Sequence, residues 1–217
     1  MYKMKKTVIE GIEIKTSWEQ ITLEEFLPLS VIEKDEELLD KPLRRSLERI
    51  KVLTGKDEEE LLDLPGDVFG HLITASKFLD VEPETLFKEI ATFFIGEVEY
   101  GYRKPGELSA GEYISLELGI AKAIKQKSSM LPDILSILIR PVVRGNDPEI
   151  GETVDVEKFD VKKHQPRIDK FMKELRVPFF IHALSRITVG AQGVNQVVKN
   201  FMNTDDTTKK GKKSKKK

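Results

Sequence analysis

The spacing of apolar residues along this chain follows two different periods. Over most of its length, apolar residues recur every three or four positions with charged residues between them, which is typical of amphipathic helices. This spacing predicts helices over residues 23–28, 40–54, 67–79, 83–94, 109–126, 132–141, 168–175, 177–187 and 194–201, and a short helix that opens at 57–60. The chain is therefore expected to be mainly helical.

Two stretches instead alternate apolar and polar residues, with the period of a β-strand. These are residues 7–15, in which Gly11 marks a bulge or a hairpin turn, and residues 97–103. Alternation of this kind is typical of strands that bury one face. We expect the two stretches to pair into one small antiparallel sheet. The predicted fold is thus a single helical α+β domain over residues 1–203 with this minor sheet.

Local signals predict where several helices begin. Thr22 with Glu25, and Ser109 with Glu112, each form a capping box, in which the hydroxyl accepts the later amide and the carboxylate accepts the earlier one. Pro28 is expected to bend or end the first of these helices, because proline lacks the amide that a helix interior needs.

The second half of the chain contains a strongly apolar segment followed by a polar one. Residues 132–141 are apolar nearly all round, so a central helix ended by Pro141 is expected. Residues 144–160 are acidic and rich in turn-forming residues, which predicts an exposed loop with one short strand at 154–156. Residues 204–217 contain no apolar side chain and predict a disordered tail rich in lysine.

Charge is distributed unevenly along the sequence. Seven of the 36 basic residues lie in the tail, namely Lys209, Lys210, Lys212, Lys213, Lys215, Lys216 and Lys217. Residues 1–208 therefore hold 29 basic and 37 acidic residues, a net charge of −8. Such a tail attracts the phosphates of DNA by counterion release, without reading the base sequence. An arm that docks onto the acidic surface of a neighbouring subunit is the alternative, and the sequence leaves both open.

The sequence lacks the motifs on which most enzyme classes depend. There is no cysteine, which suits a reducing cytoplasm and excludes disulfides and thiolate chemistry. His71, His164 and His182 form no metal-binding helical pair. There is no phosphate-binding glycine loop and no serine nucleophile elbow. We expect a protein that is not an enzyme and binds no metal or cofactor, with an unrecognised active site as the alternative. No apolar run is long enough to predict a membrane span.

Two groups of residues are candidates for a protein interface. The first contains amphipathic aromatic residues beside the predicted strands, namely Trp18, Tyr100 and Tyr102. The second contains carboxylates of the predicted acidic loop, namely Asp147, Glu149, Glu152 and Asp155. The alternative for the aromatic residues is that they close the edge of the core, and for the carboxylates that the loop is simply solvated.

Three stretches carry a resemblance to a known group of proteins. Leu108–Glu117, with the sequence LSAGEYISLE, and Leu131–Pro141, with the sequence LPDILSILIRP, resemble small structural and tail-assembly proteins of tailed bacteriophages, including crAss-like phages. The stretch from Trp18 to Phe26, WEQITLEEF, resembles the opening motif of the same group. Residues 190–201 and the lysine tail depart from the pattern.

The resemblance implies a protein that works by binding copies of itself and other phage structural proteins. It implies an oligomeric ring or connector in the head–tail region of the virion, made in the host bacterial cytoplasm. A tail assembly chaperone that is absent from the mature virion is an alternative within the same group. A nucleic-acid-binding accessory protein that acts through Lys209–Lys217 is an alternative from another class.

Overall fold

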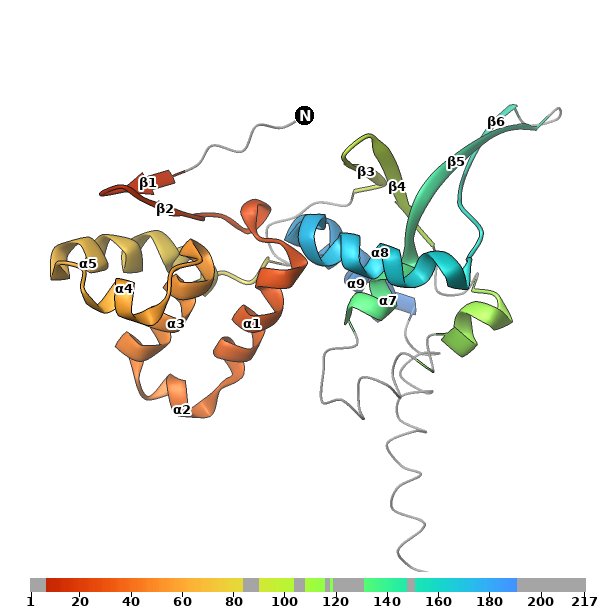
Figure 1. Ribbon diagram of the computed structural model, residues 1–217. Coiled ribbons are helices and arrows are strands. Elements are labelled where there is room, and N and C mark those ends of the chain that lie inside the picture. Colours follow the sequence, from red (N-terminus) through yellow and green to blue (C-terminus); the bar gives the residue numbers. More distant parts are fainter. Residues whose placement is uncertain are drawn as a thin grey trace, which may run out of the picture.

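The computed structural model describes residues 7–83, 90–103, 108–115, 118, 131–147 and 151–190. Two lobes lie side by side (Figure 1), which we call the N-terminal lobe, residues 7–83, and the C-terminal lobe, residues 90–190. The fold is mainly helical with two small antiparallel sheets, so the predicted α+β class is confirmed.

The N-terminal lobe packs short helices beneath a β-hairpin (Figure 1). Its elements are β1 (Thr7–Ile9), β2 (Ile12–Ile14), η1 (Trp18–Gln20), α1 (Leu23–Lys34), α2 (Glu36–Leu39), α3 (Pro42–Thr54), α4 (Glu58–Leu62), α5 (Gly66–Ala75) and η2 (Ser76–Asp80).

The C-terminal lobe packs helices against a four-stranded sheet (Figure 1). Its elements are β3 (Thr92–Ile95), β4 (Val98–Tyr102), α7 (Leu131–Leu138), β5 (Ile139–Asp147), β6 (Gly151–Val156), α8 (Val161–Glu174) and α9 (Val177–Gly190).

Both predicted capping boxes are present. The Thr22 hydroxyl accepts the Glu25 amide at 3.4 Å, and the Glu25 carboxylate accepts the Thr22 amide at 3.0 Å. Ser109 and Glu112 form the same two bonds. The first helix continues through Pro28 to Lys34, so the alternative in which Pro28 ends it is wrong. The fully buried Leu29 follows Pro28, and its packing favours continuing the helix.

The predicted pairing of residues 7–15 with residues 97–103 is wrong. Strand β1 pairs with β2 through the two-residue turn Glu10–Gly11, with Ile9 opposite Ile12. Both turn residues have positive φ, 47° and 80°, as a tight hairpin turn of the type I′ class requires. Strand β1 pairs with the strand nearest to it along the chain, because closing a two-residue loop costs far less entropy than closing one of eighty residues.

Residues 97–103 instead join a sheet made only of neighbours along the chain, in the order β3-β4-β5-β6. Phe93 lies opposite Tyr100, and Tyr100 lies opposite Pro141. The helix predicted over 83–94 is wrong at Phe93 and Phe94, which lie in β3, while residues 84–89 fall outside the described residues.

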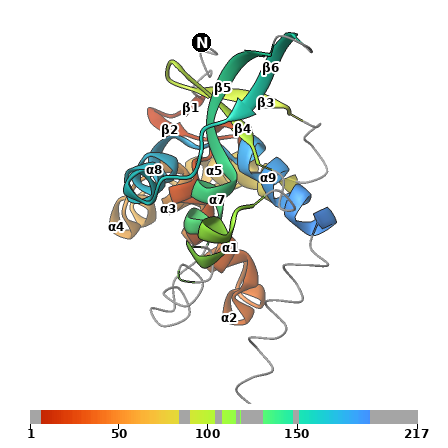
Figure 2. The same cartoon turned by 90° about the vertical axis from the view of Figure 1, so that its right-hand side faces the viewer.

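The region after the apolar helix also differs from the prediction. Helix α7 ends at Leu138, and Ile139 begins a strand that runs straight through Pro141. The predicted acidic loop is a β-hairpin of β5 and β6, with Val142 opposite Val156 and Asp147 opposite Gly151. Figure 2 shows this hairpin rising above the helices of its lobe.

The remaining predicted elements are confirmed only where the chain is described. Helix α8 begins at Val161 and ends at Glu174, so it covers the predicted helix 168–175 except for its last residue, and α9 contains the predicted 177–187. Of the predicted helix 109–126, residues 110–115 and 118 are helical. The predicted helix 194–201 and the predicted tail 204–217 lie outside the described residues.

One apolar core continues through both lobes. It extends from Ile12 and Leu23 in the first lobe to Phe171 and Phe180 in the second. The backbone also joins them, because the Leu23 amide donates to the Leu175 carbonyl at 2.8 Å and the Val177 amide donates to the Ile21 carbonyl at 3.1 Å. The two lobes therefore hold each other in place through paired backbone and shared core.

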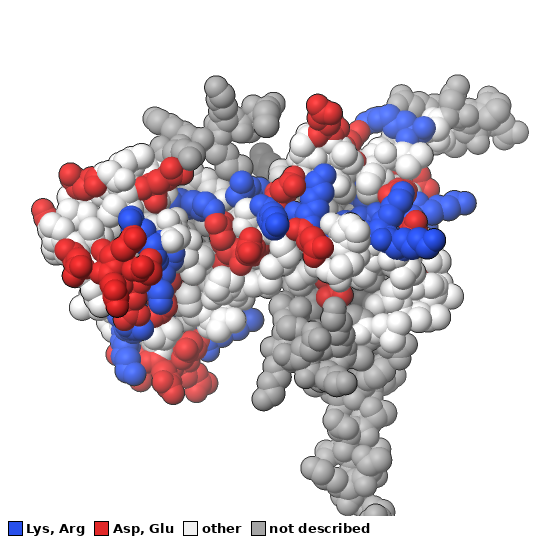
Figure 3. All heavy atoms as spheres, viewed as in Figure 1, with Lys and Arg blue, Asp and Glu red and all other residues white. Residues whose placement is uncertain are grey.

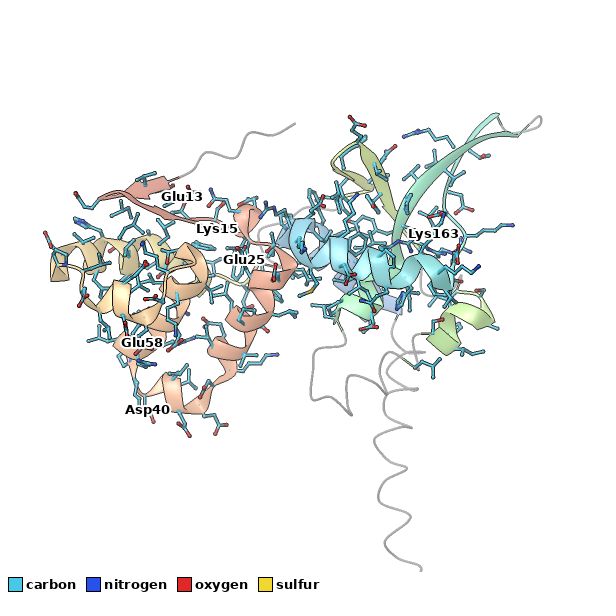
Figure 4. The ribbon with its side chains drawn as sticks, in the orientation of Figure 1. Glu13, Lys15, Glu25, Asp40, Glu58 and Lys163 are labelled. Carbon is cyan, nitrogen blue, oxygen red and sulfur yellow. The ribbon has the colours of Figure 1, made fainter. Side chains whose placement is uncertain are left out.

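Ion pairs join the elements of the N-terminal lobe. Lys15, just after β2, pairs with Glu25 of α1 (Figure 4). Arg49 of α3 is buried and pairs with Glu33 of α1 at 2.6 Å and with Asp80 of η2 at 2.8 Å. Arg45 pairs with the same Glu33. Glu33 is thus the carboxylate that ties α1 to α3.

Candidate interaction groove

A groove of about 480 Å³ lies between α8 and one face of the C-terminal sheet. Its lining combines an apolar wall from the strands with a charged wall from the helix. It is lined by Val98, Tyr100, Pro141, Val143, Glu157, Lys163, Pro166, Arg167 and Lys170. We call this feature the α8 groove.

The sheet wall follows from strand alternation and register. Val98 and Tyr100 are two residues apart on β4, and Pro141 and Val143 are two apart on β5, so each pair faces the same side of its strand. Because Tyr100 is opposite Pro141, both pairs share one face of the sheet. Val98 is 38% exposed and Val143 is 50% exposed, so this apolar wall is open to solvent.

The helix wall follows from helical spacing. Lys163, Arg167 and Lys170 are four and three residues apart, which places them on one face of α8. Asp160 caps the helix, since its carboxylate accepts the Lys162 amide at 2.9 Å. Residues 158–173 hold six basic and two acidic residues, a net charge of +4.

The groove holds three cations and one carboxylate, a net charge of +2. Glu157 accepts from both Lys163 and Arg167, the latter at 3.2 Å. Arg167 also donates to the Ser136 carbonyl at 2.9 Å. Burial lowers the pKa of the Arg167 guanidinium, although Glu157 opposes the shift. The Lys170 ammonium lies 5.5 Å from the centre of the Tyr100 ring.

Lys163 and Lys170 are the cations of this groove that can meet a ligand. Lys163 is exposed at the end of the groove, and Lys170 is half-buried above Tyr100. Arg167 is buried and already bonded to two groups, so it fixes the wall in place. The arrangement therefore suits a partner with an apolar centre and carboxylates around it.

The opposite face of the sheet is held by a buried ion pair. Arg140 of β5 pairs with Glu112, and both side chains are almost fully buried. Burial acts to raise the pKa of Glu112, but hydrogen bonds from Ser109 and the charge of Arg140 outweigh it and hold the pKa below 4.5. Burial lowers the pKa of Arg140 in turn, against the attraction of Glu112. This pair anchors the base of the hairpin to the helical segment 110–115.

The aromatic residues predicted to form an interface make their contacts with other residues of the same chain. The Trp18 indole donates to the Val81 carbonyl at 2.9 Å and packs edge-on against Phe78, 5.4 Å between ring centres. Tyr100 is also buried, and the Tyr102 hydroxyl donates to the Phe179 carbonyl at 2.9 Å. Trp18 and Tyr100 therefore close the core, as the alternative interpretation stated, and Tyr100 also lines the groove.

The predicted carboxylate group lies along the β5–β6 hairpin. Asp147 and Glu152 belong to its two strands, and Glu149 lies outside the described residues. Asp155 is exposed and pairs with Arg103 at 3.3 Å. The lysines of the tail, Lys209–Lys217, also lie outside the described residues.

A serine, a histidine and an aspartate meet between α7 and α8. Ser136 Oγ lies 2.7 Å from His164 Nδ1, and Asp133 Oδ1 lies 3.5 Å from His164 Nε2. The Ser136 hydroxyl is fully buried and donates to the Asp133 carbonyl at 2.8 Å. A substrate cannot reach this hydroxyl, so the cluster ties the two helices together and does not supply a nucleophile.

Among the residues that the structure describes, no three His, Asp or Glu side chains come close enough to hold a metal ion. No helix within the same ranges is both long and apolar enough to cross a membrane.

The α8 groove was not predicted from the sequence. One signal was present, since Lys163, Arg167 and Lys170 recur at helical spacing beside an apolar helical face. The other wall could not be found, because Val98 belongs to a strand that was predicted to pair with residues 7–15, and Val143 belongs to a strand that was not predicted.

Comparison of the chain with protein-family models, curated proteins and solved structures finds no match. What the fold and the groove define is therefore a class in physical terms, namely a two-lobed α+β protein with an open, basic, apolar-walled groove.

Proposed function

We propose that this chain is a non-enzymatic structural protein of a tailed bacteriophage, which assembles with copies of itself into a ring or connector of the head–tail region. Its partners are its own copies and other phage structural proteins, and it is made in the host bacterial cytoplasm and carried in the virion. The observation that supports self-assembly is a division of charge between the two lobes.

The charge division appears in a single view (Figure 3). Acidic side chains gather over α4, while basic side chains gather over α8 and the nearby hairpin. Residues 56–67 hold six acidic residues and one lysine, a net charge of −5, against +4 over residues 158–173. We call residues 56–67 the α4 surface. Two unlike, oppositely charged surfaces in different lobes favour a head-to-tail contact between copies.

A head-to-tail contact generates a closed ring when its rotation closes, and an open filament when it does not. The same modest contact is then repeated at every subunit boundary. A ring of this kind needs no single strong anchor residue, because closure makes the contacts act together. This agrees with the resemblance of residues 18–26, 108–117 and 131–141 to phage structural and tail-assembly proteins.

Mass spectrometry of purified virions of the encoding phage tests the proposal. A ring or connector is expected in the particle at a fixed ratio to the other structural proteins. Absence from the particle, with presence in infected cells, would overturn the ring and favour the assembly chaperone.

A nucleic-acid-binding accessory role is the second candidate, favoured by the exposed lysines of α8 together with Lys209–Lys217. Deleting residues 205–217 tests it. A DNA binder loses salt-sensitive DNA retention, because each phosphate contact contributes to the salt dependence. A ring component assembles as before.

A further inference from the structure

We infer that the α4 surface of one copy seats in the α8 groove of the next copy. The inference rests on the proposed self-assembly and names the two surfaces that make the contact. It follows from an apolar match, from a charge match and from the placement of the two surfaces in different lobes.

The apolar match centres on Leu62. This leucine is the last residue of α4 and is 63% exposed, although acidic residues surround it in sequence. The α8 groove offers an open apolar wall formed by Val98, Pro141 and Val143. Burying a leucine side chain contributes about 1.5–3 kcal/mol. A partner that is apolar at the centre and basic around it buries this leucine and also attracts the carboxylates beside it.

The charge match uses carboxylates of the α4 surface that form no ion pair and the net positive charge of the groove. Glu58 pairs with Arg44 and Lys51, and Glu60 pairs with Lys56. Glu59 and Asp63 flank Leu62, are exposed, and form no ion pair among the residues that the structure describes. In the groove, Lys163 and Arg167 share one carboxylate, Glu157, and the half-buried Lys170 forms no ion pair among the residues that the structure describes. The two free carboxylates thus meet the surplus positive charge of the groove.

The placement of the surfaces prevents the contact from forming within one chain. Figure 4 shows Glu58 in the N-terminal lobe and Lys163 in the C-terminal lobe, toward opposite ends of the molecule. Because the two lobes share a core and paired backbone, they cannot fold onto one another. A second copy is therefore the occupant, and its own groove then stays open for a third.

Disulfide cross-linking tests this contact without interference, because the natural chain contains no cysteine. The full-length variant with Leu62→Cys and Val143→Cys is oxidised and run on a non-reducing gel. We expect a ladder of dimers and larger species that collapses on reduction. The matched control pairs Val31→Cys with Val143→Cys, since Val31 of α1 is 66% exposed, as Leu62 is, but lies outside the α4 surface.

The outcomes separate the inference from the proposed function. A ladder in the first variant that greatly exceeds the control supports the contact. Equal cross-linking in both variants, with the natural chain oligomeric by mass, overturns the contact and leaves self-assembly standing. A natural chain that stays monomeric at every concentration overturns both.

A charge-reversal series gives an independent measurement. Glu59→Lys and Lys163→Glu are each expected to weaken assembly by up to about fivefold, the range of an exposed ion pair, and their combination is expected to recover part of the loss. Lys173→Glu is the control, because it changes the same helix outside the groove. An equal loss from the control, or no recovery in the double variant, would overturn the pairing.

Discussion

At the scale of single residues, Arg140 and Arg144 lie on the same face of β5 but in two different environments. Arg140 pairs with Glu112, with exposed side-chain fractions of 2% and 3%. Arg144 pairs with Glu99 at 2.7 Å, but its own side chain is 53% exposed. Water screens the second pair and leaves the first unscreened, so the two arginines contribute differently to stability although each meets a glutamate.

Arg140→Ala is expected to lower the free energy of unfolding by about 3–5 kcal/mol, because Glu112 is left buried without its partner. Arg144→Ala is the matched control and is expected to cost less than about 1 kcal/mol. Urea denaturation of both variants measures the difference. Equal losses would contradict the assignment of Arg140 and Glu112 as a buried pair.

The stability of the N-terminal lobe depends on pH through the carboxyl group of Glu33. Burial acts to raise the pKa of Glu33, but hydrogen bonds and charge attraction from Arg49 and Arg45 outweigh burial, so its pKa lies below the ordinary value of 4.5. A carboxyl with a lowered pKa stabilises the fold fully above its unfolded pKa. This stabilisation is lost as pH falls through the lower, folded value.

Glu33→Gln is therefore expected to be less stable than the natural chain above about pH 5, with the difference shrinking as pH falls below about 4.5. Thermal unfolding between about pH 3 and pH 7 measures the trend. Glu37→Gln is the control, since Glu37 is exposed and makes no ion pair among the described residues. A difference that grows on acidification would reverse the sign and contradict the argument.

The residue scale also shows what the sequence can and cannot predict. The capping boxes at Thr22 and Ser109 were predicted because both partners lie within three residues of each other. The burial of Trp18 was left open, because it depends on a carbonyl at Val81, 63 residues away. Residue type alone is compatible with an interface and with a core edge for such a side chain.

At the scale of elements, the β5–β6 hairpin is the main departure from the prediction. Residues 134–139 are apolar except for Ser136, and in so short an apolar stretch a buried helix and a buried strand have the same pattern. Pro141 was interpreted as the end of a helix, yet it lies in β5 opposite Tyr100. The strand conformation of β5 depends on its pairing with β4, which lies about forty residues earlier in the chain, so the local sequence does not reveal it.

Gly101 tests the packing of this hairpin against β4. A Cβ at this position would lie 3.1 Å from Val156 Cγ1 and 3.2 Å from Val142 Cγ2. Gly101→Val is expected to destabilise the fold by about 1–3 kcal/mol, because the larger side chain overpacks the strands. Urea denaturation gives the free energy of unfolding.

Gly70→Ala is the matched control for this substitution. A Cβ there meets nothing within 4 Å, and Gly70 lies inside α5. It is expected to stabilise the fold by about 0.5–1 kcal/mol, because alanine loses less backbone entropy in a helix. If Gly101→Val were as stable as the natural chain, the close packing of β4, β5 and β6 would be contradicted.

At the scale of the whole molecule, charge is organised by folding more than by sequence order. The composition predicted an acidic body with a basic tail. Within that body the fold separates a basic α8 from an acidic α4, about a hundred residues apart in sequence, onto different lobes (Figure 3). The net charge of residues 1–208 is a single sum and does not show this division. The division becomes visible only in the folded arrangement.

Self-assembly through these two surfaces is the central claim, and the mass of the full-length protein in solution tests it most directly. Light scattering is measured at about 0.1 M and about 1 M salt, between which the screening length falls from about 10 Å to about 3 Å. The account predicts a whole multiple of the 24.8 kDa subunit at the lower salt concentration and partial dissociation at the higher one. A 24.8 kDa monomer at every protein and salt concentration would contradict it.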